Sequence, residues 1–297
     1  MYRNILVPVD GSKLSERALV LAVPLADQHN AKLTLITVNE PIEDLTLGGG
    51  APVRDSALDI TWRKERGAYL KKLLARVTRR TESPVEAVTL EGRVAPALAA
   101  YAAGHDVDLI VMCTHGRGGF QRLWLGSVAD GLSRRTAVPL LLARGGRAPG
   151  SRMLHDPLFR RILVPLDGSD RAESALHAAC TLAGDAKVVI TLAHVLHPMT
   201  VVAAGNLASD RERDVITSYL DPLATSIRTE RLTVDTDTRV STNVARALLE
   251  MAEENEDDLI VISGQGMSGL ERLVVGSVAD KLIRTARVPV MVCPAAA

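Results

Sequence analysis

The chain has 297 residues, with 35 basic and 35 acidic side chains and 47% hydrophobic residues, which is ordinary globular material for roughly two domains of about 150 residues each. Its zero net charge and few aromatic residues exclude general attraction to polyanions and a row of base-stacking platforms, so we expect no nucleic-acid partner. No segment reaches the ~20 apolar residues of a membrane span and no secretory leader is visible, so we expect a cytoplasmic protein without a membrane partner.

In chain order, the first half alternates short β-branched runs with helical patterns. Strands are expected at residues 4–8, 32–38, 85–90, 109–113 and 139–143. Helices are expected between them, beginning with residues 15–25. A later helix should bury one face, because four apolar residues recur at helical spacing, namely Leu70, Leu73, Leu74 and Val77.

The second half carries a matching apolar stripe at Ile216, Leu220, Leu223 and Ile227. Pro222 interrupts it, and we expect the proline to kink or restart that helix.

The chain also repeats itself. The run Ile5-Leu-Val-Pro-Val-Asp-Gly-Ser12 returns as Ile162-Leu-Val-Pro-Leu-Asp-Gly-Ser169, and Gly126-Ser-Val-Ala-Asp130 returns as Gly276-Ser-Val-Ala-Asp280. Such self-similarity indicates two copies of one structural unit. We therefore predict domains at residues 1–144 and 161–297, joined by a linker at 145–160 that is rich in Gly, Pro and Arg.

The alternation of strands and helices predicts an α/β fold in each copy. Each should be a Rossmann-like or flavodoxin-like domain with a five-stranded parallel open sheet flanked by helices. Sheets of this kind bind ligands beyond the carboxyl ends of their strands, where the strand order reverses. The residues that follow strands one and four are therefore the candidates for function.

An Asp-Gly-Ser turn follows the first strand of each copy, at Asp10 and again at Asp167. Taken alone, such a turn caps the helix that follows it. At the switch point of an open sheet its carboxylate could instead accept a hydrogen bond from a ribose hydroxyl or a base amino group. The recurrence of the turn in both copies favours this second interpretation.

Small residues and glycines follow the fourth strand. In the first copy Cys113-Thr-His-Gly-Arg-Gly-Gly119 precedes a helix that opens with Gly126-Ser127-Val128; in the second, Ser263-Gly-Gln-Gly266 precedes Gly276-Ser277-Val278 at the same spacing. Glycine lets the backbone approach an anion, and the first amides of a helix bind phosphate. Neither loop reads GxxxxGK[ST], so a Walker-type NTPase is not indicated.

Together, the ILVPVDGS run, the THGRGG loop and the GSVAD helix start resemble the universal stress protein family, here as a tandem of two domains. The spacing of Gly, two residues, Gly, nine residues, Gly and Ser or Thr marks the ATP-binding branch of that family. The resemblance covers nearly all of both copies. It implies adenine nucleotide alpha hydrolase-like domains that bind ATP, with Mg²⁺ carried by the phosphates, in a stress-response sensor or regulatory module that hydrolyses ATP slowly at most.

The resemblance also implies which residues contact the nucleotide. Those expected near the adenosine are Pro8, Asp10 and Val38 in the first copy and Pro165, Asp167 and Val195 in the second. Those expected along the ribose and phosphates are Met112, Gly116, Arg117, Gly126, Ser127 and Val128, and then Ile262, Gly266, Gly276, Ser277 and Val278. No catalytic residue and no dedicated metal ligands are expected.

Two departures from the family pattern matter. Its first glycine is Cys113 in one copy and Ser263 in the other, where a Cβ would be strained if the position required a positive φ. Arg117 becomes Met267 in the second copy, so we expect the N-terminal site to bind better. These departures leave open an interaction module with degenerate nucleotide sites. An adenylate-transferring or ATP-hydrolysing enzyme on a related fold is the other alternative, although the SGGxDS, HIGH-like and KMSKS-like signatures are missing.

Three further features bear on partners and chemistry. The last strand of each copy, at residues 138–143 and 288–293, is apolar and would form a sheet edge, and such edges usually pair. By resemblance, they would join the two copies within one chain or form a homodimer. His115 is interpreted as a positioning residue because its counterpart is Gln265, and Cys113 as a small strand-end residue rather than a redox sensor.

Overall fold

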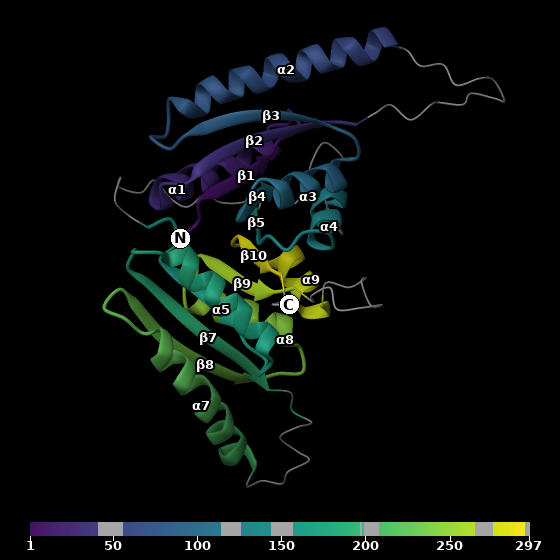
Figure 1. The fold of residues 1–297 in the computed structure, drawn as a ribbon. Helices are drawn as coiled ribbons and strands as arrows, with labels where there is room; N and C mark the ends of the chain where they lie inside the picture. Colours follow the sequence, from purple (N-terminus) through teal and green to yellow (C-terminus); the bar gives the residue numbers. More distant parts are fainter. Residues whose placement is uncertain are drawn as a thin grey trace, which may run out of the picture. The chain divides into compact units, whose positions relative to one another are not determined.

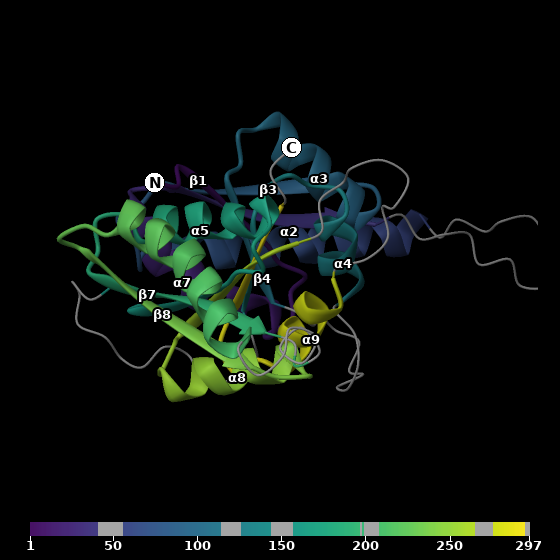
Figure 2. The same ribbon diagram turned by 90° about the horizontal axis from the view of Figure 1, so that it is seen from below.

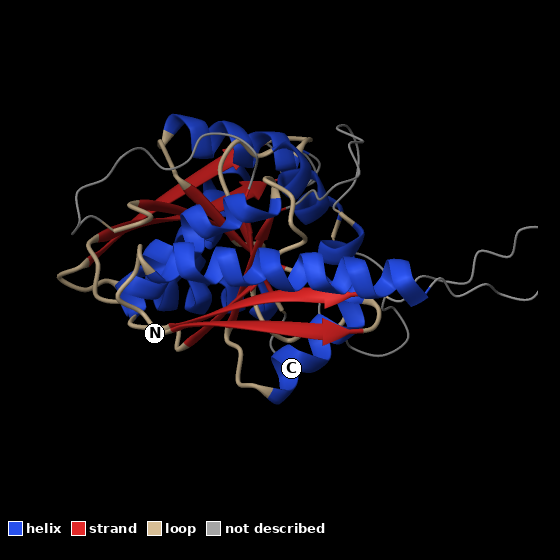
Figure 3. Ribbon diagram, turned by 90° about the horizontal axis from the view of Figure 1, so that it is seen from above, coloured by secondary structure: helices blue, strands red, loops and turns tan. Residues whose placement is uncertain are grey.

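The computed structural model describes residues 1–40, 56–113, 126–143, 157–196, 198, 208–264 and 276–294. The chain divides into two compact units. The first-repeat unit consists mainly of residues 2–122 and 126–138, and the second-repeat unit of residues 139–297. Each unit is an α/β domain whose helices pack on its strands (Figure 3). In the parts of the chain that the structure describes, no helix is both long and apolar enough to cross a bilayer.

The first-repeat unit contains four parallel strands in the order β3-β2-β1-β4. They are β1 (Asn4–Pro8), β2 (Lys32–Asn39), β3 (Val85–Glu91) and β4 (Leu109–Cys113). The connecting helices are a 3-10 turn η1 (Ser15–Ala18), α1 (Leu19–His29), α2 (Ser56–Thr78), α3 (Val94–Gly104) and α4 (Ser127–Ser133). Helix α2 packs along β2 and β3 (Figure 1). Since β1 and β4 are neighbours, the strand order reverses at the carboxyl end of β1.

The second-repeat unit repeats this order as β10-β9-β6-β7-β8, all parallel. Its strands are β6 (Arg161–Pro165), β7 (Val188–Leu196), β8 (Leu232–Val240), β9 (Leu259–Ser263) and β10 (Val290–Cys293). Its helices are α5 (Asp170–Ala183), α7 (Ala208–Ile227), α8 (Val244–Glu254) and α9 (Ser277–Thr285). Helix α7 lies beside β7 and β8, as α2 does beside β2 and β3 (Figure 2).

One strand of the first repeat belongs to the second-repeat unit. Strand β5 (Leu140–Ala143) pairs antiparallel with β10, so that Leu141 lies opposite Met291. Both strands are fully apolar and buried. Pairing between the two apolar edge strands within one chain, expected from the sequence, is therefore present.

Burial explains why the central strands are continuous apolar runs. Ile5, Leu6 and Val7 of β1 are fully buried, as are Ile162, Leu163 and Val164 of β6. Continuous apolar runs of this kind belong to parallel strands covered on both faces, whereas alternating patterns belong to half-exposed sheets. The predicted strand positions are confirmed to within one residue at each end.

Two helical predictions need correction. The segment expected as one helix from residue 15 begins as the 3-10 turn η1 before α1 starts at Leu19. Helix α7 runs unbroken through Pro222, so the expectation that this proline restarts the helix is wrong. Pro222 lies on the exposed side of α7, where the hydrogen bond lost at a proline costs least because water can replace it.

Candidate nucleotide-binding site

The second-repeat unit has a cavity of about 550 Å³ at the carboxyl ends of its central strands. Its lining includes seven of the eight residues predicted for this copy, namely Pro165, Asp167, Val195, Ile262, Gly276, Ser277 and Val278. The eighth, Gly266, lies outside the described residues. Residues far apart in the sequence therefore meet in one cavity: the ends of β6, β7 and β9 and the start of α9. The volume falls within the range of small-molecule pockets.

The turn after β6 is held by its own side chains. Asp167 Oδ1 accepts hydrogen bonds from the Ser169 amide at 3.0 Å and from the Ser169 hydroxyl at 2.6 Å. Ser169 in turn caps α5 by accepting from the amide of Ala172 at 3.3 Å. Gly168 between them has a φ of 84°, which an L side chain adopts only with strain. The capping interpretation is thus confirmed, and Asp167 still lines the cavity with its other oxygen unbonded to any described residue.

Helix α9 begins at this cavity. Its N-cap residue Gly276 has φ −50° and ψ 146°, and no side chain caps the helix. Gly276, Ser277 and Val278 all line the hollow. An uncapped helix start presents unpaired amides and the positive end of the helix dipole, which together attract an anion.

The first repeat builds the same turns. Asp10 Oδ1 accepts from the Ser12 amide at 2.9 Å, Gly11 has a φ of 83°, and the Gly126 N-cap of α4 has φ −52° and ψ 145°. Val38 and Met112 are nearly buried at the ends of β2 and β4. Pro8 ends β1, while Ser127 and Val128 open α4. Gly116 and Arg117 lie outside the described residues, as do His115, Gln265 and Met267.

The residues that replace the first glycine of the pattern are not strained. Cys113 ends β4 and Ser263 ends β9, and neither is among the described residues with a positive φ. The condition for a Cβ penalty, a positive φ, is therefore not met at this position, because the strand continues through it. Burial raises the pKa of the Cys113 thiol to about 11, although Arg17 acts in the opposite direction. Cys113 is thus the reverse of an activated thiolate.

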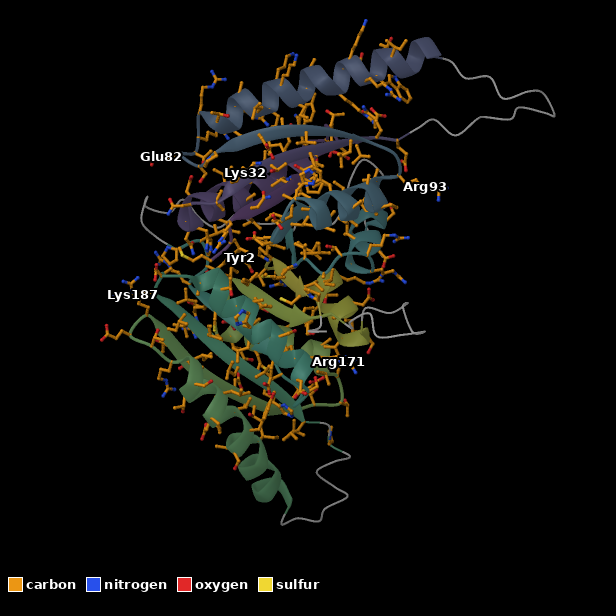
Figure 4. The ribbon with its side chains drawn as sticks, in the orientation of Figure 1. Tyr2, Lys32, Glu82, Arg93, Arg171 and Lys187 are labelled. Carbon is orange, nitrogen blue, oxygen red and sulfur yellow. The ribbon has the colours of Figure 1, made fainter. Side chains whose placement is uncertain are left out.

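Five side chains that line these cavities were not predicted from the sequence. Arg171, near the start of α5, lines the second-repeat cavity (Arg171 is labelled in Figure 4). In the first repeat a smaller cavity of about 280 Å³ beside Asp10 and Gly11 is lined by Trp62, Arg66 and Tyr69, together with Glu65. Their helical spacing could have predicted the residues of this helix that face the site, because residues 62, 66 and 69 extend the apolar stripe of Leu70 toward the start of the helix.

The described residues contain no further candidate metal site built from histidine or acidic side chains. His194 on β7 uses Nδ1 in a 2.8 Å hydrogen bond with the carbonyl oxygen of Leu166, and its sequence neighbour His197 is not among the residues described. No group of three or more His, Cys, Asp or Glu side chains converges within the described ranges.

Comparison with known proteins agrees with this geometry. The model of the universal stress protein family matches residues 1–144 and, a second time, residues 158–294. A universal stress protein of Thermus aquaticus is 35% identical over 145 residues, which are 48% of this chain and 100% of that protein. One from Mycobacterium tuberculosis (strain ATCC 25618 / H37Rv) is 23% identical over 299 residues, covering 97% of this chain and 96% of its own.

A solved structure shares the fold over its full length. The crystal structure of a universal stress protein from Archaeoglobus fulgidus DSM 4304 matches with a TM-score of 0.69 and 21% identity, covering 98% of each chain. Two family matches along one chain, together with a relative that aligns through both repeats, identify this chain as a tandem-domain member of the universal stress protein family.

Proposed function

We propose that the protein binds an adenine nucleotide, ATP in the first instance, and acts as a nucleotide-dependent sensor or regulatory module in a stress response. One observation carries this proposal: the second-repeat cavity is lined by seven residues that the sequence predicts to contact a nucleotide. Their positions in the chain span more than a hundred residues, and only the fold brings them together.

The cavity offers different chemistry at its two sides. Asp167 on the β6 turn supplies a carboxylate that can accept hydrogen bonds from a ribose or a base amino group, beside the apolar Pro165 and Val195. The α9 start supplies backbone amides and a glycine that leaves room for phosphate oxygens. A nucleotide would lie with its base toward β6 and β7 and its phosphates toward α9.

Magnesium would enter with the nucleotide. Mg²⁺ keeps several of its waters and is commonly held by phosphate oxygens together with one or two protein groups. When bound, it would supply charge neutralisation to the phosphates. We expect turnover to be slow at most, because neither loop carries the lysine of a Walker motif and binding alone does not place a base on a water.

The first test is calorimetric. Purified protein is denatured and any released nucleotide is identified by chromatography, and nucleotide-free protein is then titrated with ATP and Mg²⁺. One or two equivalents bound support the proposal, and the stoichiometry gives the number of working sites. Neither released nucleotide nor binding at millimolar ATP would overturn it, and would favour the interaction module with degenerate sites.

A further inference from the structure

The first half of α2 turns an unusual face toward the first-repeat site. Residues 62, 66, 69 and 73 follow one another at steps of four, three and four, so they lie on one side of the helix. Leu73 on this stripe is buried in the core, yet Trp62 is 50% exposed and lines the cavity beside Asp10. A large aromatic side chain thus lines this cavity while much of its surface remains exposed to solvent.

Arg66 fixes the position of this part of α2. Its Nη1 donates to the carbonyl oxygen of Val38 at 3.0 Å and lies 3.4 Å from Oδ1 of Asn39. Both acceptors are at the carboxyl end of β2. Trp62 stands one helical turn before Arg66, so the anchored turn sets the distance between the indole and the end of the sheet.

Charge and size indicate which part of a ligand this cavity takes. Among the described residues that line it, Asp10 and Glu65 carry negative charge and Arg66 alone carries positive charge. Burial and the carboxylates of Glu16 and Asp10 raise the pKa of Tyr69, so its hydroxyl remains protonated. Excess negative charge disfavours a triphosphate here, whereas about 280 Å³ beside an exposed indole suits a flat, uncharged ring.

We propose that Trp62 stacks on the base of a purine nucleotide bound in the first-repeat site and sets the base preference of that site. This inference rests on the proposed nucleotide binding and adds a specificity residue to it. The second repeat lacks the same anchor, because Ile216 stands at the position of Arg66 and is buried in the core. Base selection by an α2 aromatic is therefore a property of the first site.

The experiment isolates the first site in the full-length protein. Gly276→Asp places a carboxylate where the phosphates of the second site would lie, at a φ of −50° that any residue adopts and a position where Asp is a favoured N-cap. In this background, titration with ATP, CTP and tripolyphosphate is compared among the parent, Trp62→Ala, Trp62→Phe and Lys64→Ala. Lys64 is exposed on the opposite face of α2 and serves as the matched control.

The expected result is selective. Trp62→Ala should weaken ATP binding roughly tenfold, the size of one lost base-aromatic stack. Trp62→Phe should retain most of the affinity, and tripolyphosphate binding should not change. ATP should also quench the tryptophan fluorescence of the parent, a change that Trp62→Phe removes even though Trp124 remains.

The outcomes separate the two proposals. If the unmodified protein binds no nucleotide, the proposed function fails and the role of Trp62 fails with it. If the Gly276→Asp protein binds ATP and Trp62→Ala binds it equally well, only the role of Trp62 is overturned. Circular dichroism of each variant shows whether α2 is still folded, and Trp62→Phe gives a second, milder test.

Discussion

The two repeats share their strand-end turns but differ at the opposite end of the sheet. In the first repeat Val107 is buried just before β4, and the Thr34 hydroxyl donates to Glu86 Oε1 at 3.0 Å and lies 3.5 Å from Asn4 Oδ1. In the second repeat the counterpart of Val107 is Asp257, which is only 4% exposed, and the counterpart of Asn4 is Arg161. The first repeat therefore buries an apolar side chain at the position where the second repeat buries a carboxylate.

The buried polar side chains of the second repeat are poorly supplied with hydrogen bonds. Thr191 lies close enough to Asp257 to favour its charged form, yet no well-formed hydrogen bond among the described residues reaches either carboxylate oxygen, Arg161 Nε or Thr191 Oγ1. In the first repeat, by contrast, Glu86 also pairs with Lys32 at 2.6 Å (Lys32 is labelled in Figure 4). A buried charge without hydrogen bonds costs stability. The two repeats are therefore similar at the strand-end turns but differ in stability at the other end of the sheet.

The largest predicted effect is a pH dependence of the second-repeat unit. Burial raises the pKa of Asp257 to about 7, with Asp258 and Asp237 adding to the effect and Arg161 and the Thr191 hydroxyl opposing it. Because the folded-state pKa exceeds the unfolded value near 4, this carboxyl makes the unit less stable as pH rises from about 4 to about 7. At pH 7 the raised pKa of this carboxyl lowers the free energy of unfolding by roughly 4 kcal/mol relative to its value at low pH. Hydrogen exchange of β6 and β9 amides, corrected for intrinsic rates, measures it.

Two variants test this prediction. Asp257→Asn keeps the shape but does not titrate, so the difference from the parent should vanish below about pH 4 and grow toward pH 7. Asp257→Val with Arg161→Asn rebuilds the first-repeat arrangement and should stabilise the unit at pH 7 by about 1–4 kcal/mol. Equal pH profiles for the parent and Asp257→Asn would refute the prediction, and β1 and β4 provide an internal reference.

The next effect concerns the helix starts. Gly126→Asp and Gly276→Asp each place a negative charge where a phosphate would bind, and we expect each to weaken nucleotide binding at its own site about a hundredfold, or ~2.7 kcal/mol. Calorimetry of the single and double variants would show stoichiometry falling one site at a time. Unchanged affinity in the double variant would mean that the phosphates do not lie at α4 and α9.

Much of this comparison was visible in the sequence. The strands could be predicted because Ile5 to Val7 and Ile162 to Val164 are continuous apolar runs. The candidate sites could be predicted because repeated motifs at fixed spacing mark the strand ends. The buried Asp257 could not be predicted, since it stands in an acidic run that is typical of a solvated turn. Whether such a side chain is buried depends on how the turn packs on β6 and β7, which no local pattern reveals.

A smaller effect should come from a cation of the second site that the first repeat replaces with an apolar residue. Arg171 lines the second cavity, whereas its counterpart in the first repeat is Leu14. In a Gly126→Asp background, Arg171→Ala should weaken ATP binding by roughly fivefold, about 1 kcal/mol for an exposed charged contact, and leave adenosine binding unchanged. An equal loss for adenosine would show that Arg171 shapes the cavity and does not contact phosphate.

The smallest effect is a difference between two equivalent caps. Ser169→Ala removes the side-chain N-cap of α5 and should cost about 1 kcal/mol of stability in the second-repeat unit. Ser12 makes the corresponding bond to the Ser15 amide at 3.0 Å, but there the Ser15 hydroxyl also donates to the Ser12 carbonyl at 2.9 Å. Because that second bond survives, Ser12→Ala should cost less. Exchange of the first amides of α5 and η1 compares the two, and equal losses would mean that the extra hydroxyl contributes nothing.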